Sequence, residues 1–109
     1  MVNLMIYQNG TYRVHELTGD LTMIGRAPLN HIVIENPVVS AQHAMVLKIG
    51  DSYQLKDLNS TNGTQINGMF VTDTDTDLKD GDEIRFGTVR AVFAEYHRKV
   101  RTKQFREKP

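Results

Sequence analysis

Three short segments of the sequence carry side chains that together suit a phosphate group. They are Gly25-Arg26, Ser40-Ala41-Gln42-His43 and Ser60-Thr61-Asn62-Gly63-Thr64. An arginine guanidinium meets a phosphate through two parallel hydrogen bonds, and hydroxyl or backbone N–H groups satisfy the remaining oxygens. A phosphorylated side chain brings about −1.5 to −2 charges and three strong acceptor oxygens. This set of donors predicts a phosphate-binding site formed by Arg26, Ser40, Thr61 and Asn62.

All three segments fall at the boundaries of short predicted strands. About eleven apolar or alternating segments are separated by turn residues, and Gly, Asn and β-branched residues interrupt every window of helical period. Asn9-Gly10 is typical of a two-residue hairpin turn, and Asn67-Gly68 marks another turn. We therefore predict an all-β, antiparallel sandwich of about eleven short strands. Loops collect at the ends of such a sandwich, so residues distant in sequence can form one site.

Composition describes one folded domain followed by a basic segment. The chain has 109 residues, 39% of them apolar, and contains no cysteine, which excludes disulfides and thiolate metal sites. Its zero net charge is the sum of −5 over residues 1–96 and +5 over residues 97–109. We predict a domain over residues 1–96 and a basic tail or linker over 97–109. No apolar run is long enough to span a membrane and no secretory signal is visible, so we expect a cytoplasmic setting.

The order and spacing of the motifs resemble the forkhead-associated (FHA) domain over roughly residues 3–96. The residues that carry the resemblance are Gly25-Arg26, Asn30, Ile32, Pro37, Val39-Ser40, His43-Ala44, Asp57-Leu58, Thr61-Asn62-Gly63-Thr64, Asn67-Gly68, Leu78, Gly81-Asp82 and Phe86-Gly87. The resemblance implies an eleven-stranded β-sandwich whose loops at one end bind phosphothreonine peptides. It also implies a protein–protein interaction module in signalling, with no catalytic activity and no cofactor.

The resemblance assigns a role to each matched residue. Arg26 would pair with the phosphate, Ser40 would donate its hydroxyl to it, and Thr61 would add a contact through its hydroxyl or backbone N–H. Asn62 would hold the main chain of the peptide. The resemblance further implies structural support of the site by Gly25, His43 and Gly63, with His43 as a buried brace between the Ser40 loop and the Thr61 loop.

The flank of the predicted site is less basic than in many members of the family. Many of them place Arg, Lys or Asn directly after the matching serine, whereas this chain has Ala41 followed by Gln42. Val38 and Val39 also supply no charge. We therefore expect weak binding, or a preference for apolar residues after the phosphothreonine.

Hydrolysis and metal binding are two other functions that these residue types could serve. Ser40, His43 and Asp57 are the residue types of a hydrolase triad, but no nucleophile elbow or oxyanion hole is evident, and Ser40 and His43 would face opposite sides if their segment is extended. The remaining histidines (His15, His31 and His97) lack metal-ligand spacing, so no metal site is predicted.

Two further segments remain open to more than one interpretation. Asp73–Asp77 fails the pattern of a calcium loop, which favours a solvated acidic loop, although phosphorylation of Thr72, Thr74 or Thr76 would create a ligand for a second copy. The basic tail favours a linker over a nucleic-acid contact. The alternative to a phosphothreonine-dependent module is a phosphate-independent interaction or oligomerisation module on the same sandwich. No small-molecule substrate or membrane partner is expected.

Overall fold

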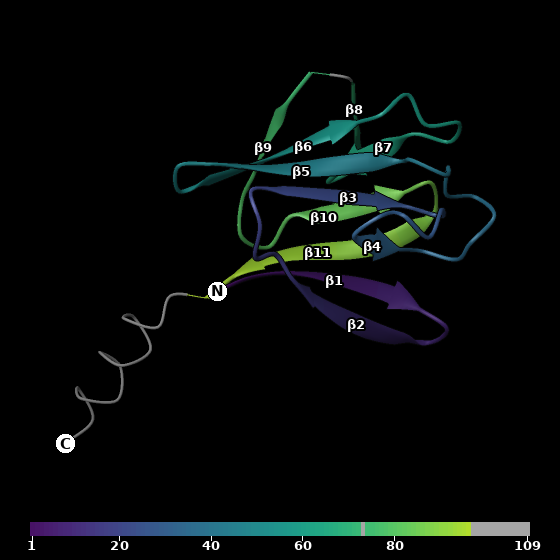
Figure 1. The fold of residues 1–109 in the computed structure, drawn as a ribbon, viewed down its shortest axis with the longest axis horizontal. Helices are drawn as coiled ribbons and strands as arrows, with labels where there is room; N and C mark the ends of the chain where they lie inside the picture. Colours follow the sequence, from purple (N-terminus) through teal and green to yellow (C-terminus); the bar gives the residue numbers. More distant parts are fainter. Residues whose placement is uncertain (73, 97–109) are drawn as a thin grey trace.

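A computed structural model describes residues 1–72 and 74–96, which form a β-sandwich (Figure 1). The residues 97–109 of the predicted tail, and Asp73, lie outside the described residues. Eleven strands are present in the described part, as predicted: β1 (Val2–Gln8), β2 (Thr11–Glu16), β3 (Leu21–Gly25), β4 (Ile32–Val33), β5 (Ala44–Ile49), β6 (Ser52–Asp57), β7 (Thr64–Ile66), β8 (Met69–Val71), β9 (Thr76–Leu78), β10 (Glu83–Phe86) and β11 (Val89–Glu95).

The strands form two sheets that pack face to face. One sheet has six strands in the order β2-β1-β11-β10-β7-β8, and the other has five in the order β4-β3-β5-β6-β9. The paired strands run antiparallel, as predicted, except that β3 and β4 are parallel. This exception arises because the turn after β3 carries the chain round so that Ile32 and Val33 return beside Ile24 and Gly25 in the same direction.

Two Asn-Gly pairs form tight hairpins in the six-stranded sheet. Asn9 and Gly10 connect β1 to β2 with φ angles of 53° and 84°, and Asn67 and Gly68 connect β7 to β8 with 50° and 86°. Positive φ at both central residues is the geometry of the turn whose twist matches paired strands. The hairpin prediction for Asn9-Gly10 and the turn prediction for Asn67-Gly68 are both confirmed.

Alternate residues of both sheets point inward and form one apolar core. Phe86 and Phe93 from the six-stranded sheet and Ile24 and Leu55 from the five-stranded sheet are completely buried. Tyr53 packs on Phe93 with 5.5 Å between ring centroids. Successive side chains of a strand point to opposite faces of the sheet. The interior-facing positions are therefore apolar, and their neighbours are partly exposed.

Strand β9 lies partly within the segment that the sequence suggested was a solvated acidic loop. Thr76–Leu78 pairs with β6, and Leu78, opposite Tyr53, is 6% exposed. The Asp77 carboxylate accepts a hydrogen bond of 3.0 Å from the Gln54 amide across the strands. The loop interpretation was therefore wrong for Thr76 and Asp77, because one buried leucine and a cross-strand pair are sufficient to extend the sheet.

The loops that carry the predicted site residues gather at one end of the sandwich. In Figure 1 the connections β1–β2, β3–β4, β4–β5, β6–β7 and β10–β11 lie at the end opposite the N-terminus, and the N-terminus lies beside the end of β11. Met1 and Tyr96 continue that pairing through two backbone hydrogen bonds of 2.8 and 2.9 Å. Within the described residues there is no helix long and apolar enough to cross a membrane.

The core predicts the effect of a large-to-small substitution at its centre. Replacing Phe93 by Ala removes a fully buried ring and its contact with Tyr53, so the free energy of unfolding should fall by about 3–5 kcal/mol. Urea denaturation followed by circular dichroism measures this change. Val14, which is 61% exposed, provides the control, since Val14→Ala should change stability by less than about 0.5 kcal/mol. Equal effects of the two substitutions would contradict the core assignment.

Candidate phosphate-binding site

The three segments singled out from the sequence meet at the loop end of the sandwich. The backbone N–H of Arg26, just after β3, donates to the carbonyl oxygen of Ser40 at 2.9 Å. The Ser40 hydroxyl oxygen in turn accepts the backbone N–H of Thr61 at 3.0 Å. The loops after β3, before β5 and before β7 are thus joined in series, with Ser40 as the middle member.

His43 bridges two of these loops from beneath. Its ring is completely buried, with Nδ1 accepting the backbone N–H of Ser40 at 3.0 Å and Nε2 lying 2.9 Å from the carbonyl oxygen of Gly63. Since Nδ1 is an acceptor, the ring proton is on Nε2 and the imidazole is neutral. The ring also packs edge-on against Phe86, with 5.7 Å between centroids.

Burial lowers the pKa of His43, although the bond to the Gly63 carbonyl and the negative charge of Asp57 act in the opposite direction. Protonation would place a hydrogen on Nδ1, directly facing the Ser40 N–H donor. The neutral ring is therefore the form that fits both loops at once.

A buried carboxylate shapes the loop that carries Thr61 and Asn62. Asp57 is 8% exposed and accepts hydrogen bonds from the Ser60 hydroxyl (2.6 Å), the Ser60 backbone N–H (3.0 Å) and the Thr64 hydroxyl (2.6 Å). Burial alone would raise the pKa of Asp57, but these bonds and the nearby His43 lower it overall. From the sequence alone, Asp57 is only a candidate triad acid and a member of the family pattern. Its position three residues before Ser60 is typical of an aspartate whose side chain accepts hydrogen bonds from the turn that follows it.

The functional groups that remain for a ligand point outward from this framework. The exposed Arg26 side chain donates from Nε to the Val39 carbonyl oxygen at 2.9 Å, and among residues 1–72 and 74–96 its two terminal nitrogens have no partner. The exposed Asn62 donates from Nδ2 to the Val38 carbonyl oxygen at 2.9 Å, which leaves its Oδ1 as an acceptor. Each side chain is fixed at one end and available at the other.

Two glycines allow the loops to approach one another. A methyl group on Gly25 would lie 2.3 Å from the carbonyl oxygen of Ala41, so only glycine fits there. Beside it the buried Asn30 donates two hydrogen bonds, to the carbonyl oxygens of Ala27 (2.8 Å) and Ala41 (2.7 Å). Asn30 was noted in the sequence only as a member of a pattern. Its side chain ties the β3–β4 turn to the Ser40 loop.

Gly63 adopts a φ of +85° and lies under the Phe70 ring, where an added Cβ would be 2.6 Å from a ring carbon. The positive φ is the reason that this position favours glycine, since the Phe70 ring is 67% exposed and free to move. Ala41 and Gln42, the positions where the sequence departs from the family pattern, are both exposed beside the site. They bring no charge to it.

The geometry does not form a hydrolase triad. Residues 41 and 42 bend, so the extended segment that would place Ser40 and His43 on opposite faces is not formed. Instead, the two ring nitrogens of His43 are occupied by backbone groups and the Ser40 hydroxyl oxygen is occupied by Thr61. Asp57 bonds to Ser60 and Thr64. Among the described residues, no cluster of three or more His, Asp or Glu is suited to a metal ion.

The fold and the site define an all-β binding domain. Comparison with known proteins identifies its family. The sequence model of the FHA domain matches residues 22–87, which include every residue of the candidate site. The chain therefore belongs to the FHA domain family, as the sequence motifs suggested.

Relatives and solved structures agree with this assignment. The chain is 36% identical over 77 residues to the oxoglutarate dehydrogenase inhibitor of Corynebacterium jeikeium, covering 71% of this chain and 52% of the relative. A structure from a study of phosphothreonine-dependent FHA domain interactions superposes with a TM-score of 0.80 at 31% identity, covering 88% of this chain and 97% of the other.

Mycobacterium tuberculosis EmbR, solved in complex with a low-affinity phosphopeptide, gives a TM-score of 0.75 at 30% identity, covering 87% of this chain and 26% of EmbR. The chain thus spans about half of the corynebacterial relative and a smaller share of EmbR.

The His43 bridge predicts a loss of stability in mild acid. Because the pKa of His43 is lowered by folding, the unfolded chain binds more protons below pH about 6.5, and stability should fall as the pH decreases through that value. The loss from one such group reaches at most about 1.4 kcal/mol per pH unit. His15, whose pKa is lowered by burial and by Arg13, acts in the same direction.

Site-resolved NMR titration of the histidine rings between pH 5 and 7.5 separates the two contributions. This window also excludes Asp57, whose lowered pKa affects stability only in stronger acid, as the pH falls below about 4. A His43 ring that titrates at or above 6.5 would contradict the neutral bridge.

Proposed function

We propose that this chain is a phosphothreonine-dependent protein–protein interaction module that docks phosphorylated partner proteins in signalling. The observation that carries the proposal is the convergence of Arg26, Ser40 and Thr61, whose backbone and side-chain groups are joined by direct hydrogen bonds at one exposed surface. Membership of the FHA domain family supports it, as do the phosphopeptide complex of EmbR and the phosphothreonine-dependent interactions studied for the structural neighbour.

Each proposed site residue has a role that its geometry supports. Arg26 pairs with the phosphate through its two terminal nitrogens, while its Nε bond to Val39 holds the guanidinium in place. Ser40 accepts from the backbone N–H of Thr61, so its own hydroxyl proton is free to donate to a phosphate oxygen. Thr61 adds its exposed hydroxyl, and Asn62 offers Oδ1 to a backbone N–H of the peptide.

The module acts by binding and not by chemistry. Membership of the FHA family and the similarity to an inhibitor protein support regulation of a partner over turnover of a substrate. The site needs no cofactor, because the arginine and the hydroxyl donors neutralise and bind the phosphate directly. We further propose that residues 1–96 form the binding domain, that 97–109 form a tail or linker, and that the protein acts in the cytoplasm.

Recognition is local and depends on the phosphate more than on the overall charge. Residues 1–96 carry a net charge of −5, which opposes a phosphate at long range. At physiological salt, charges further away than about 8 Å are largely screened, so Arg26 and the surrounding donors dominate. The uncharged Ala41 and the nearby Val38 then favour an apolar residue close to the phosphothreonine.

Arg26 is the residue whose loss should abolish binding. Arg26→Ala removes two charge-assisted hydrogen bonds, each worth about 1.5–3 kcal/mol, so affinity for a phosphothreonine peptide should fall at least about a hundredfold. Isothermal titration calorimetry with a peptide selected from an oriented phosphopeptide library measures the loss. Circular dichroism should show a folded variant, since Arg26 is exposed.

Arg85→Ala is the matched control because it removes the same charge from β10, where Arg85 pairs in register with Arg90 and Gln65 and is none of the proposed site residues. This variant should retain full affinity. Binding of the unmodified peptide, or unchanged binding by Arg26→Ala, would contradict the proposal and favour a phosphate-independent interaction module.

A further inference from the structure

A groove of about 450 Å³ opens at the same end of the sandwich as the candidate phosphate site. It lies between the β1–β2 hairpin, the segment that follows β4 and the β10–β11 turn, three connections that Figure 1 places at that end. Its lining includes polar and charged residues from all three: Tyr7, Arg13, Glu35, Asn36, Thr88 and Arg90. None of these residues has been assigned to the phosphate site.

The turn from Asn36 to Val39 connects the groove to the phosphate site, since Asn36 lines the groove. Within the turn, the Asn36 side chain accepts the Val38 N–H at 3.0 Å and the Asn36 carbonyl accepts the Val39 N–H at 2.9 Å. On the side of the phosphate site, the Val38 and Val39 carbonyls receive Asn62 Nδ2 and Arg26 Nε. This turn therefore contributes Asn36 to the groove and two carbonyl groups to the support of the phosphate site.

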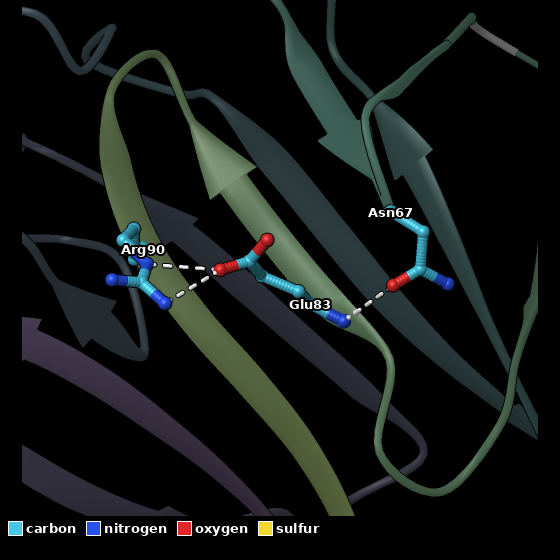
Figure 2. A network of polar contacts seen from close by, with 3 residues as sticks. All are labelled: Asn67, Glu83 and Arg90. Atoms are coloured by element: carbon cyan, nitrogen blue, oxygen red, sulfur yellow. Dashed lines mark hydrogen bonds and ion pairs between the residues drawn. The ribbon is translucent and has the colours of Figure 1, made fainter.

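The two arginines of the groove differ in what they can offer to a ligand. Arg90 is already engaged, because its Nε and Nη2 bind the Glu83 carboxylate at 2.9 and 2.8 Å. Figure 2 shows this pair, with the backbone N–H of Glu83 donating to Asn67. Among residues 1–72 and 74–96, Arg13 has no ion pair and no side-chain hydrogen bond, although Glu35 lines the same groove.

Arg13 lies on β2, the edge strand of the six-stranded sheet, at the rim of the space between the two sheets. It lies opposite Ile6, which is completely buried, so its side chain leaves β2 on the inner side of an edge strand. A charge in this orientation also discourages edge-to-edge pairing with another chain. That role accounts for an arginine on the edge, but it does not account for the groove next to it.

We propose that this groove is a second recognition subsite, in which Arg13 binds a carboxylate of the same partner whose phosphothreonine occupies the Arg26 site. The proposal rests on the proposed function. An extended chain advances about 3.3 Å per residue, so six residues added to a peptide reach about 20 Å further from the phosphothreonine. Glu35 opposes this contact, and its charge tunes how strongly an acidic flank is preferred.

The test uses a seven-residue phosphothreonine peptide from the library selection and versions extended by six residues at either end. Each extension carries three glutamates, or three glutamines as the uncharged match. One acidic extension should tighten binding about three- to fivefold over its glutamine match, the size expected of one exposed ion pair. Arg13→Gln should remove this gain and Glu35→Gln should enlarge it, while Arg85→Gln, outside the groove lining, should leave it unchanged.

Opposite effects of Arg13→Gln and Glu35→Gln separate a charge contact from a structural effect. Affinity for the seven-residue peptide should be the same in all three variants. Equal affinities of the acidic and uncharged extensions at both ends, or a gain that persists in Arg13→Gln, would overturn the subsite while leaving the phosphate site intact. Failure of the seven-residue peptide to bind would instead overturn the proposed function, and the subsite with it.

Discussion

One imidazole holds together the loops on which the candidate site depends. His43 receives a backbone N–H from Ser40 on one side and faces the Gly63 carbonyl on the other, in the interior of the sandwich. Both backbone groups lie below residues that would touch a phosphate, so the ring fixes the spacing between Ser40 and Thr61. A buried polar ring is tolerated because both nitrogens are satisfied. Only the neutral form satisfies both, which links the geometry of the surface to the ionisation of a residue beneath it.

Two further buried polar side chains support the site from within the protein, as His43 does. The Asp57 carboxylate holds the loop before β7, and the Asn30 amide joins the β3–β4 turn to the Ser40 loop. Each of these polar side chains is buried and hydrogen-bonded within the protein, whereas Arg26, Thr61 and Asn62 are exposed. The residues that support the site are therefore buried, and the groups available to a ligand are exposed. A site that is already formed loses less conformational entropy on binding, which favours recognition of one small, highly charged group.

Local signals in the sequence were sufficient for the Asn-Gly hairpins and for the three segments that meet at the loop end, but not for features that depend on contacts between distant segments. Asn9-Gly10 dictates its turn through backbone preferences alone, and the motif order indicated Arg26 and Ser40. Strand β9 was missed because its evidence is a single leucine that becomes apolar core only beside Tyr53. The groove could not be anticipated either, since Arg13 and Thr88 come together only when the β1–β2 and β10–β11 connections reach the same end of the sandwich.

The central claim is that a preformed surface above the His43 bridge recognises the phosphate itself. The most direct test is a ¹H–¹⁵N NMR titration of the folded chain with a phosphothreonine peptide and with its unmodified form. The phosphorylated peptide should shift the backbone amides of Ser40, Thr61 and Asn62 and the Arg26 Nε–H, while His43 keeps its proton on Nε2. Shifts of the same size with the unmodified peptide, or shifts confined to other surfaces of the sandwich, would contradict it.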